Sequence, residues 1–218
     1  MSADAWPALY IQFVKDIQAY LEHEPNSYKA LHRLGIHVRM GRDNYVITQS
    51  KPPVVYLQPW FYGYNNETVE HEYGHILLAW SNIESQMIQE YGSREAAQPF
   101  IESLCEQALP FLRITQPMVD EAVRRYGVTS RAVVFLMLKA KARPEVALRR
   151  LIYDHPNAER AGFITSGNYI REVARCNLGL PFSWLERVPE PSAWFPSDIP
   201  VSFTRIPHTH NLIGVVAG

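Results

Sequence analysis

Cysteine is scarce in this sequence, long apolar runs are missing, and neither sign of charge is in excess. Cys105 and Cys176 are the only cysteines among 218 residues, which is too few for a disulfide framework and is typical of a reducing compartment. No apolar run approaches the roughly 20 residues of a membrane span. The first residues include Asp4 and lack the basic segment and apolar block of a signal peptide. We therefore expect a cytoplasmic protein that does not enter a membrane.

The balance of charges also excludes one class of function, the binding of nucleic acid through overall charge. The formal net charge is −1, so overall charge does not steer the protein to nucleic acid. With 47% hydrophobic and 20% charged residues, the composition is that of a globular protein. The length suits one core of ordinary size with a small appendage.

The period of the apolar residues changes along the first part of the chain, which predicts an α+β fold. Residues 7–21 and 27–34 have helical spacing, and Gly35 ends the second helix. Three short strands then follow, and we expect them to form a small antiparallel sheet with a turn at residues 41–44. The strands are expected at residues 36–40, 45–48 and 54–57.

Residues 71–75, with the sequence His-Glu-Tyr-Gly-His, are the most informative stretch for function. An asparagine at position 65 or 66 can cap the expected helix, and apolar residues recur through it at helical spacing. His71 and His75 are four residues apart, so both imidazoles can reach one metal ion from one helix face. Glu72 stands beside them, placed to accept a proton from a metal-activated water. Such a zinc site needs a third protein ligand and leaves the fourth position for water.

The residues that follow this pattern in known metal sites limit where the third ligand of this chain can lie. A metzincin requires glycine at position 78 and histidine at position 81, where this chain has Leu78 and Ser81, so that class is excluded. A carboxylate from the next long helix remains, expected over residues 93–109.

Two carboxylates of that helix, Glu102 and Glu106, are candidates. Pro99 starts or kinks this helix, and Pro110 is expected to end it. Glu102 has apolar neighbours on both sides, as an inward-pointing ligand should. Glu106 remains an alternative ligand, and exposed surface carboxylates remain the ordinary explanation for both.

An aromatic loop, residues 59–64, leads into the helix of the two histidines. Its rings can simply cover the edge of the sheet, or they can line a substrate cleft. In the second case Tyr62 or Tyr64 could donate a hydrogen bond to an oxyanion. The sequence does not choose between the two tyrosines.

Three further helices are expected at residues 115–126, 130–141 and 143–153, and they resemble a helix-turn-helix. Basic residues concentrate there, which allows DNA contact. A solvated helical face is the ordinary explanation, and several of the apolar residues indicate core. From residue 156 a hairpin around residues 166–168 and a short apolar strand at the end are expected. We therefore divide the chain into residues 1–112, 113–155 and 156–218.

Two longer stretches resemble the ImmA/IrrE family of metallopeptidases, in particular its radiation-response regulators. Residues 100–105, Phe-Ile-Glu-Ser-Leu-Cys, resemble the segment of that family that contains the third ligand, and the interval from His75 to Glu102 looks the same. Residues 125–132, Arg-Tyr-Gly-Val-Thr-Ser-Arg-Ala, resemble the start of its helix-turn-helix-like region. The similarity covers roughly residues 27–153, and three motifs in order at matching intervals are strongly specific.

The resemblance implies a zincin-like metallopeptidase domain, a helix-turn-helix-like region and a β-containing extension. It implies His71, His75 and Glu102 as ligands and Glu72 as the catalytic base. It also implies a narrow substrate, a helix-turn-helix repressor of the XRE class, whose cleavage releases stress-response genes. Zinc suits this ligand set best, and manganese or iron is also compatible.

The chain departs from the family pattern at two places. The radiation-response regulators carry a GAF-like sensor domain after the helical region, and the segment from residue 156 is too short for a complete one. Pro99, just before the ligand-bearing turn, also differs. The alternatives are a DNA-binding regulator with a structural metal and a module that sequesters a repressor without cutting it. Both are weakened because a structural zinc site normally has four protein ligands, and three are found.

Overall fold

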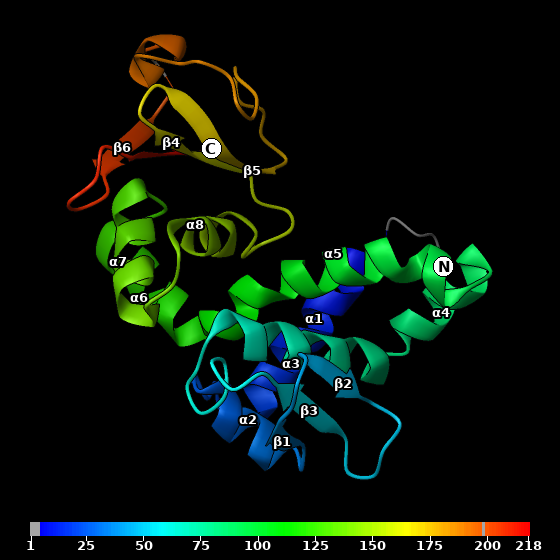
Figure 1. Ribbon diagram of the computed structural model, residues 1–218. Helices are drawn as coiled ribbons and strands as arrows, with labels where there is room; N and C mark the ends of the chain where they lie inside the picture. The colour runs from blue at the N-terminus through cyan, green and yellow to red at the C-terminus, as the bar shows by residue number, and fades with distance from the viewer. Residues whose placement is uncertain (1–4, 198) are drawn as a thin grey trace. The chain divides into compact units, whose positions relative to one another are not determined.

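The computed structural model describes residues 5–197 and 199–218 and has an α+β architecture. The chain forms two compact units, Met1–Thr115 and Gln116–Gly218 (Figure 1). The helices that follow residue 115 and the segment from residue 156 belong to one unit, where the sequence suggests two. In the part of the chain that the structure describes, no helix is both long and apolar enough to cross a membrane.

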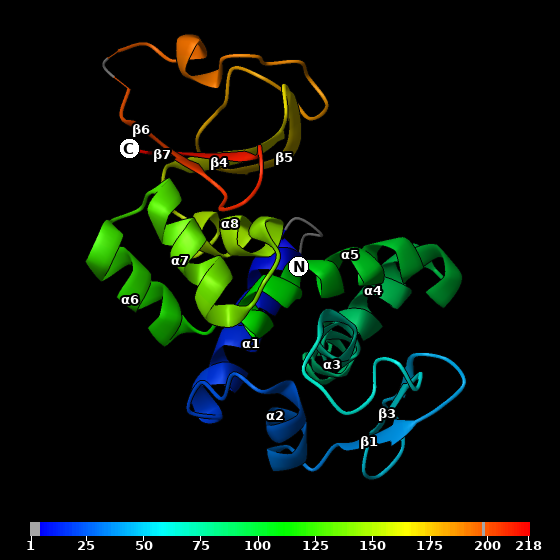
Figure 2. The same cartoon turned by 60° about the vertical axis from the view of Figure 1, so that its left-hand side comes forward.

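The first unit is built around helix α3 (Glu67–Trp80), which lies between a small sheet and two other helices. The sheet packs on one side of α3, and α5 (Arg94–Arg113) packs on the other, where it also contacts α1 (Trp6–Tyr20) (Figures 1 and 2). One hydrophobic core joins these layers, with Tyr10 and Tyr73 among its fully buried side chains. The remaining elements are α2 (Ser27–Arg33), β1 (His37–Met40), β2 (Tyr45–Ile47), β3 (Val54–Leu57) and α4 (Ile83–Tyr91).

The small sheet is mixed, so the expectation of an antiparallel sheet is wrong for one of its two pairings. β3 lies in the centre, with β1 parallel and β2 antiparallel to it. β3 is the most apolar and most buried strand, as suits the central position, where a strand is paired along both of its edges. Residues 41–44 therefore form no hairpin but cross the end of β3. Gln58 holds them there, since its N–H donates to Asn44 Oδ1 and its side-chain amide to the Arg42 carbonyl, both at 2.9 Å.

Helix α5 runs through both of its prolines, so the expectation that Pro110 ends it is wrong. A proline in a helix interior removes one backbone hydrogen bond and costs about 3 kcal/mol. The last turn persists because Phe111 and Leu112 are buried in the core. Arg113 adds an ion pair to Glu70, with Nη1 and Oε1 separated by 2.7 Å. Packing and charge therefore extend α5 beyond the point where local preference stops it.

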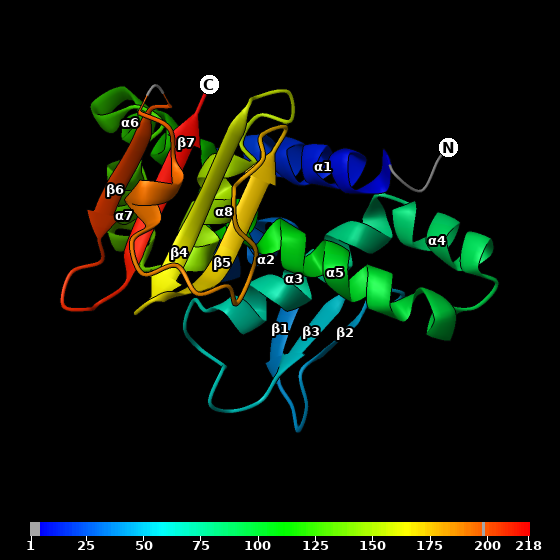
Figure 3. The ribbon, with the colours of Figure 1, turned by 90° about the horizontal axis from the view of Figure 1, so that it is seen from above.

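The second unit is a four-stranded antiparallel sheet in the order β5-β4-β7-β6. Helices α7 and α8 pack on one face, and the chain between β5 and β6 packs on the other (Figures 1 and 3). The expected hairpin around residues 166–168 is confirmed as β4 and β5, whereas β6 is not expected from the sequence. The elements are α6 (Gln116–Tyr126), α7 (Ser130–Ala140), α8 (Pro144–Ile152), β4 (Arg160–Ser166), β5 (Tyr169–Cys176), η2 (Pro191–Trp194), β6 (Val201–Arg205) and β7 (Leu212–Ala217).

Two glycines allow the layers of the second unit to approach closely. Phe163 of β4 pairs with Gly214 of β7, and a Cβ at Gly214 would lie 2.2 Å from Cε1 of the Phe163 ring. A Cβ at Gly162 would lie 2.6 Å from Cδ1 of Leu148 in α8. The ring of Phe163 also meets that of Phe182 edge to face, with centroids 4.7 Å apart. The sheet therefore has closely packed contacts on both faces.

Candidate metal centre

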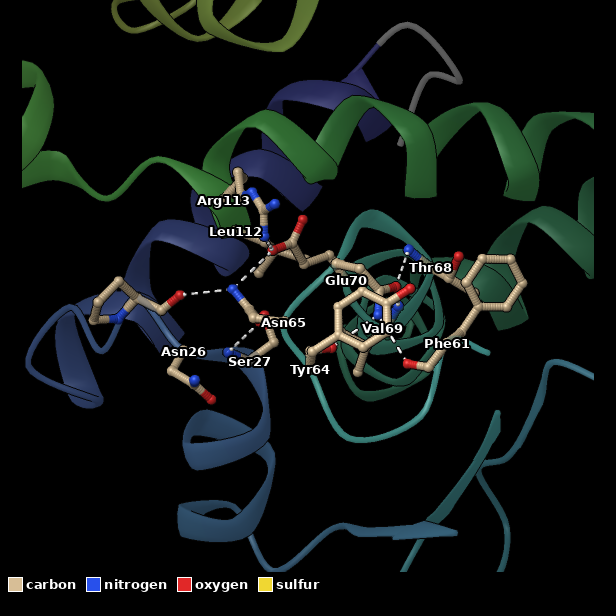
Figure 4. A network of polar contacts seen from close by, with 12 residues as sticks. Asn26, Ser27, Phe61, Tyr64, Asn65, Thr68, Val69, Glu70, Leu112 and Arg113 are labelled. Atoms are coloured by element: carbon tan, nitrogen blue, oxygen red, sulfur yellow. Dashed lines mark hydrogen bonds and ion pairs between the residues drawn. The ribbon is translucent and has the colours of Figure 1, made fainter. Parts of the chain in front are cut away.

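The start of α3 is fixed by two consecutive asparagines (Figure 4). Asn66 caps the helix, because its Oδ1 accepts hydrogen bonds from the N–H groups of Thr68 at 2.9 Å and Val69 at 3.1 Å. The Asn66 amide in turn donates to the carbonyl of Phe61 at 2.8 Å, which ties down the aromatic loop. Asn65 Oδ1 accepts from the N–H of Ser27 at the start of α2, at 2.9 Å. The position of α3 is thereby set before the first histidine.

A buried ion pair joins the first turns of α3 to the last turn of α5. Glu70 is fully buried, and its Oε1 accepts a hydrogen bond from Arg113 at 2.7 Å and a longer one from Asn65 at 3.4 Å (Figure 4). Burial raises the pKa of Glu70 to about 7, more than the neighbouring Arg113 guanidinium lowers it. Since Glu70 directly precedes His71, this pair fixes the helix beside the first candidate ligand.

The two helices approach closely at Gly74. A Cβ at this position would lie 3.5 Å from the Cβ of Cys105 in α5 and 3.5 Å from the hydroxyl of Tyr10 in α1. The Tyr10 hydroxyl donates a hydrogen bond of 2.6 Å to the Gly74 carbonyl. Three helices therefore meet at the glycine between the two histidines, and this contact brings α5 within reach of their imidazoles.

His71, His75 and Glu102 lie together, as the sequence predicts. The Nε2 atoms of the two histidines are 3.1 Å apart. Oε2 of Glu102 lies 3.1 Å from His71 Nε2 and 3.5 Å from His75 Nε2. Three donor atoms from two helices therefore form a nearly equilateral triangle.

The triangle fits a small divalent ion. Tetrahedral zinc with bonds of about 2.0–2.1 Å has neighbouring donors about 3.3 Å apart. The three observed distances, 3.1, 3.1 and 3.5 Å, lie on both sides of this value. These three residues could therefore hold a metal ion, with both imidazoles bound through Nε2.

Each of the three ligand groups has a second contact on the side away from the triangle, and all of these contacts come from α5. Gln98 donates to Oε1 of Glu102 at 2.5 Å. Nδ1 of His75 lies 3.4 Å from the sulfur of Cys105, and Nδ1 of His71 lies 3.2 Å from Oε1 of Glu106. Such contacts orient metal ligands and fix the tautomer of a histidine. Relative to Glu102, the three residues stand at positions −4, +3 and +4, which is one face of a helix.

The two histidines are in different electrostatic surroundings. The pKa of His71 is raised, chiefly by the Glu106 carboxylate 3.2 Å from its Nδ1, with the neighbouring carboxylates adding to the effect. The pKa of His75 is lowered, because it is more deeply buried. A metal ion can bind these two rings only when both Nε2 atoms are unprotonated.

Glu72 is buried beside the triangle on α3. Burial raises the pKa of Glu72 to about 7; His71 lowers it and Glu102 raises it further. A carboxylate with a pKa near the working pH is suited to general base catalysis. The surroundings of Glu72 are therefore compatible with its expected role as the catalytic base.

The two tyrosines of the aromatic loop do not join the triangle. The hydroxyl of Tyr64 donates to the carbonyl of Trp60 at 2.7 Å, and the Tyr62 ring meets that of Tyr28 edge to face at 6.3 Å. Across residues 5–197 and 199–218, neither hydroxyl is hydrogen-bonded to a residue of the triangle. Both side chains are exposed. The proposed oxyanion role stays a prediction for either.

Carboxylates neutralise several basic residues of the second unit. Glu121 forms ion pairs with both Arg125 and Lys139. The same two cations lie over the ring of Phe135, each 5.4 Å from its centroid. Further pairs are Arg149 with Glu172 and Arg150 with Asp154. Much of the positive charge that suggests DNA contact is thus paired with carboxylates of the same unit.

The N-terminus of α7 is covered as well. The N–H of Ser130 donates to Oγ of Ser202 in β6 at 2.8 Å, and the Ser130 hydroxyl shares a hydrogen bond of 2.8 Å with that of Thr204. Ser130 is completely buried. In a DNA-binding helix-turn-helix the N-terminal residues of the second helix face the bases, and here this end faces a strand.

The sequence finds the three ligand candidates but not their supporting residues. It gives Glu106 as a possible ligand, whereas the structure places Glu106 and the buried Cys105 beside the outer nitrogens of the histidines. Their helical spacing from Glu102 is a signal that could have identified them. In comparisons with known proteins, no family model and no curated protein matches this chain.

Proposed function

We propose that this protein is a zinc-dependent peptidase in which His71, His75 and Glu102 bind the metal. The donor triangle on α3 and α5, with distances of 3.1, 3.1 and 3.5 Å, carries the proposal. Among the described residues the group has three protein donors, as in catalytic zinc sites, whereas structural sites normally have four. Manganese or iron is compatible with the same donors.

The proposed reaction is hydrolysis of a peptide bond. A bound zinc ion would act as a Lewis acid that polarises the scissile carbonyl and acidifies water. Glu72 accepts the proton of the attacking water and delivers it to the leaving amine. Its pKa of about 7 suits both transfers, since the group can hold and release a proton near neutral pH. An extended substrate segment would pair with β1 or β2, the two edge strands of the small sheet.

The proposed substrate is a helix-turn-helix repressor of the XRE class, cut at one site so that stress-response genes are released. This part rests on the resemblance of residues 71–75, 100–105 and 125–132 to the ImmA/IrrE family. A cytoplasmic location would suit such a substrate, and both cysteines are free thiols. A DNA-damage or radiation response is the setting that the resemblance favours.

The test is co-incubation with the XRE-type repressor of the same cell, with intact mass as the readout. We expect one defined cut by wild type with zinc, and none when a chelator is present. Glu72→Gln should bind the same amount of metal and lose cleavage by about 10²–10⁴-fold, the usual contribution of a general base. His71→Ala should lose the metal itself. A Glu72→Gln variant that still cuts at the wild-type rate would refute the assignment of the base.

Two alternatives have distinct outcomes in the same experiment. A tight complex with uncut repressor, formed equally by wild type and Glu72→Gln, would favour sequestration. Salt-dependent operator binding unaffected by Glu72→Gln would favour a DNA-binding regulator. The ion pairs of Glu121 and the buried Ser130 weigh against the DNA-binding alternative.

A further inference from the structure

His71 has a second ring nitrogen on the side that faces away from the donor triangle. Nε2 of His71 points to the other two donors, whereas Nδ1 lies 3.2 Å from Oε1 of Glu106. A neutral imidazole has one proton, and the nitrogen that binds a metal must be the unprotonated one. If Nε2 binds the metal, Nδ1 has the proton and faces the Glu106 carboxylate at 3.2 Å, where it can donate a hydrogen bond.

Glu106 is poorly placed to be a ligand itself. It stands one helical turn after Glu102, and the ring atom nearest to it is Nδ1, not the Nε2 that completes the triangle. Its side chain is 54% exposed, so its removal leaves no cavity in the core. The contact of Glu106 with His71 can therefore be removed without disturbing the packing of α5.

We propose that Glu106 is a positioning residue that orients His71 and fixes its tautomer, so that Nε2 is available to the metal. A carboxylate that accepts a hydrogen bond from a ligating histidine also makes that histidine a better donor. Among the described residues, Nδ1 of His75 has the sulfur of Cys105 as its contact, at 3.4 Å, and a thiol is a weak acceptor. The two histidines therefore differ, and His71 is the ligand that receives carboxylate support. This inference rests on the proposed metal site. It adds Glu106 as a residue that strengthens metal binding at that site without being a ligand.

The experiment measures the dissociation constant for Zn²⁺ by competition with a chromophoric chelator, on the full chain. We expect Glu106→Ala to weaken binding by about 10–100-fold, the usual effect of removing such a partner. Glu106→Gln should lie between Glu106→Ala and wild type, because its amide oxygen still accepts the hydrogen bond without the charge. Glu90→Gln, an exposed glutamate of α4, is the matched control and should bind like wild type.

Two further measurements separate positioning from a merely structural effect. The metal-free variants should unfold at the wild-type temperature, because the Glu106 side chain is largely exposed. Nitrogen-15 spectra of the zinc-loaded protein should show His71 protonated at Nδ1 in wild type, with that proton exchanging faster with water in Glu106→Ala.

The outcomes that contradict the inference are distinct from failure of the metal site. Zinc affinities equal to wild type within about twofold in Glu106→Ala would overturn it, because a supporting contact is worth more than that. Complete loss of zinc in Glu106→Ala, with zinc retained in Glu102→Ala, would make Glu106 a ligand and overturn it as well. No zinc binding by wild type would overturn the proposed function and this inference together.

Discussion

The buried pair of Glu70 and Arg113 predicts how the stability of the first unit depends on pH. Burial raises the pKa of Glu70 from its ordinary value of 4.5 to about 7 in the folded protein. A raised pKa means that the folded state holds the proton more tightly than the unfolded state does. The protonated group therefore stabilises the fold fully below pH 4.5, and this contribution is lost as the pH rises through 7.

The size of the effect follows from the two pKa values. Each unit of difference corresponds to about 1.4 kcal/mol, so a change from 4.5 to about 7 amounts to about 3 kcal/mol. Glu70→Gln removes the titration and keeps the shape of the side chain. We therefore expect the free energy of unfolding of wild type, relative to Glu70→Gln, to fall by about 3 kcal/mol between pH 4 and pH 8.

The assay is urea unfolding of the full chain in the presence of a chelator, followed by near-ultraviolet circular dichroism. One transition is fitted for each compact unit, and the difference between the two proteins cancels the titration of the histidines. Glu67→Gln removes a charge from the first turn of α3 but keeps Glu70 and Arg113, and it serves as the control that should retain the step. A difference that is constant with pH would show that burial leaves the pKa of Glu70 unshifted, and one that rises from pH 4 to pH 8 would show that Arg113 holds it below 4.5. Either result would refute the reasoning.

The remaining predictions concern glycines. Gly74→Ala should be neutral or stabilise the first unit by up to about 1 kcal/mol, because alanine is the better helix former and its Cβ would meet Cys105 at an ordinary 3.5 Å. A loss of more than about 1 kcal/mol in urea unfolding would contradict this. Gly214→Ala should destabilise the second unit by about 1–3 kcal/mol through overlap with Phe163. Gly179→Ala, with open space around it, is the control and should have little effect; equal stability of these two variants would refute the packing argument.

Local patterns in the sequence predict most of the helices and the histidine pair. The spacing of His71 and His75 depends only on helix geometry, and the helix itself follows from the cap at Asn66 and the apolar period. Glu102 is found because its apolar neighbours predict which face of α5 is buried. In each case the information lies within one or two turns of one element.

The features that the sequence does not predict depend on contacts between distant segments. Pro110 fails to end α5 because Phe111 is buried and Arg113 pairs with Glu70, 43 residues away. The parallel pairing of β1 with β3 depends on which of the three strands takes the centre of the sheet. The role of Glu106 depends on which nitrogen of His71 faces it, and one sequence alone does not contain that orientation.

The origin of the donor distances has a consequence for the size of ion that the site accepts. The 3.1 Å between the two imidazoles joins two residues of α3, whereas both distances to Glu102 depend on the separation of α3 and α5. Calcium, with bonds of about 2.3–2.6 Å, needs donors farther apart than zinc does. The packing of α5 on α3 beside Gly74 and Cys105 therefore favours a small ion, although neither residue is among its ligands.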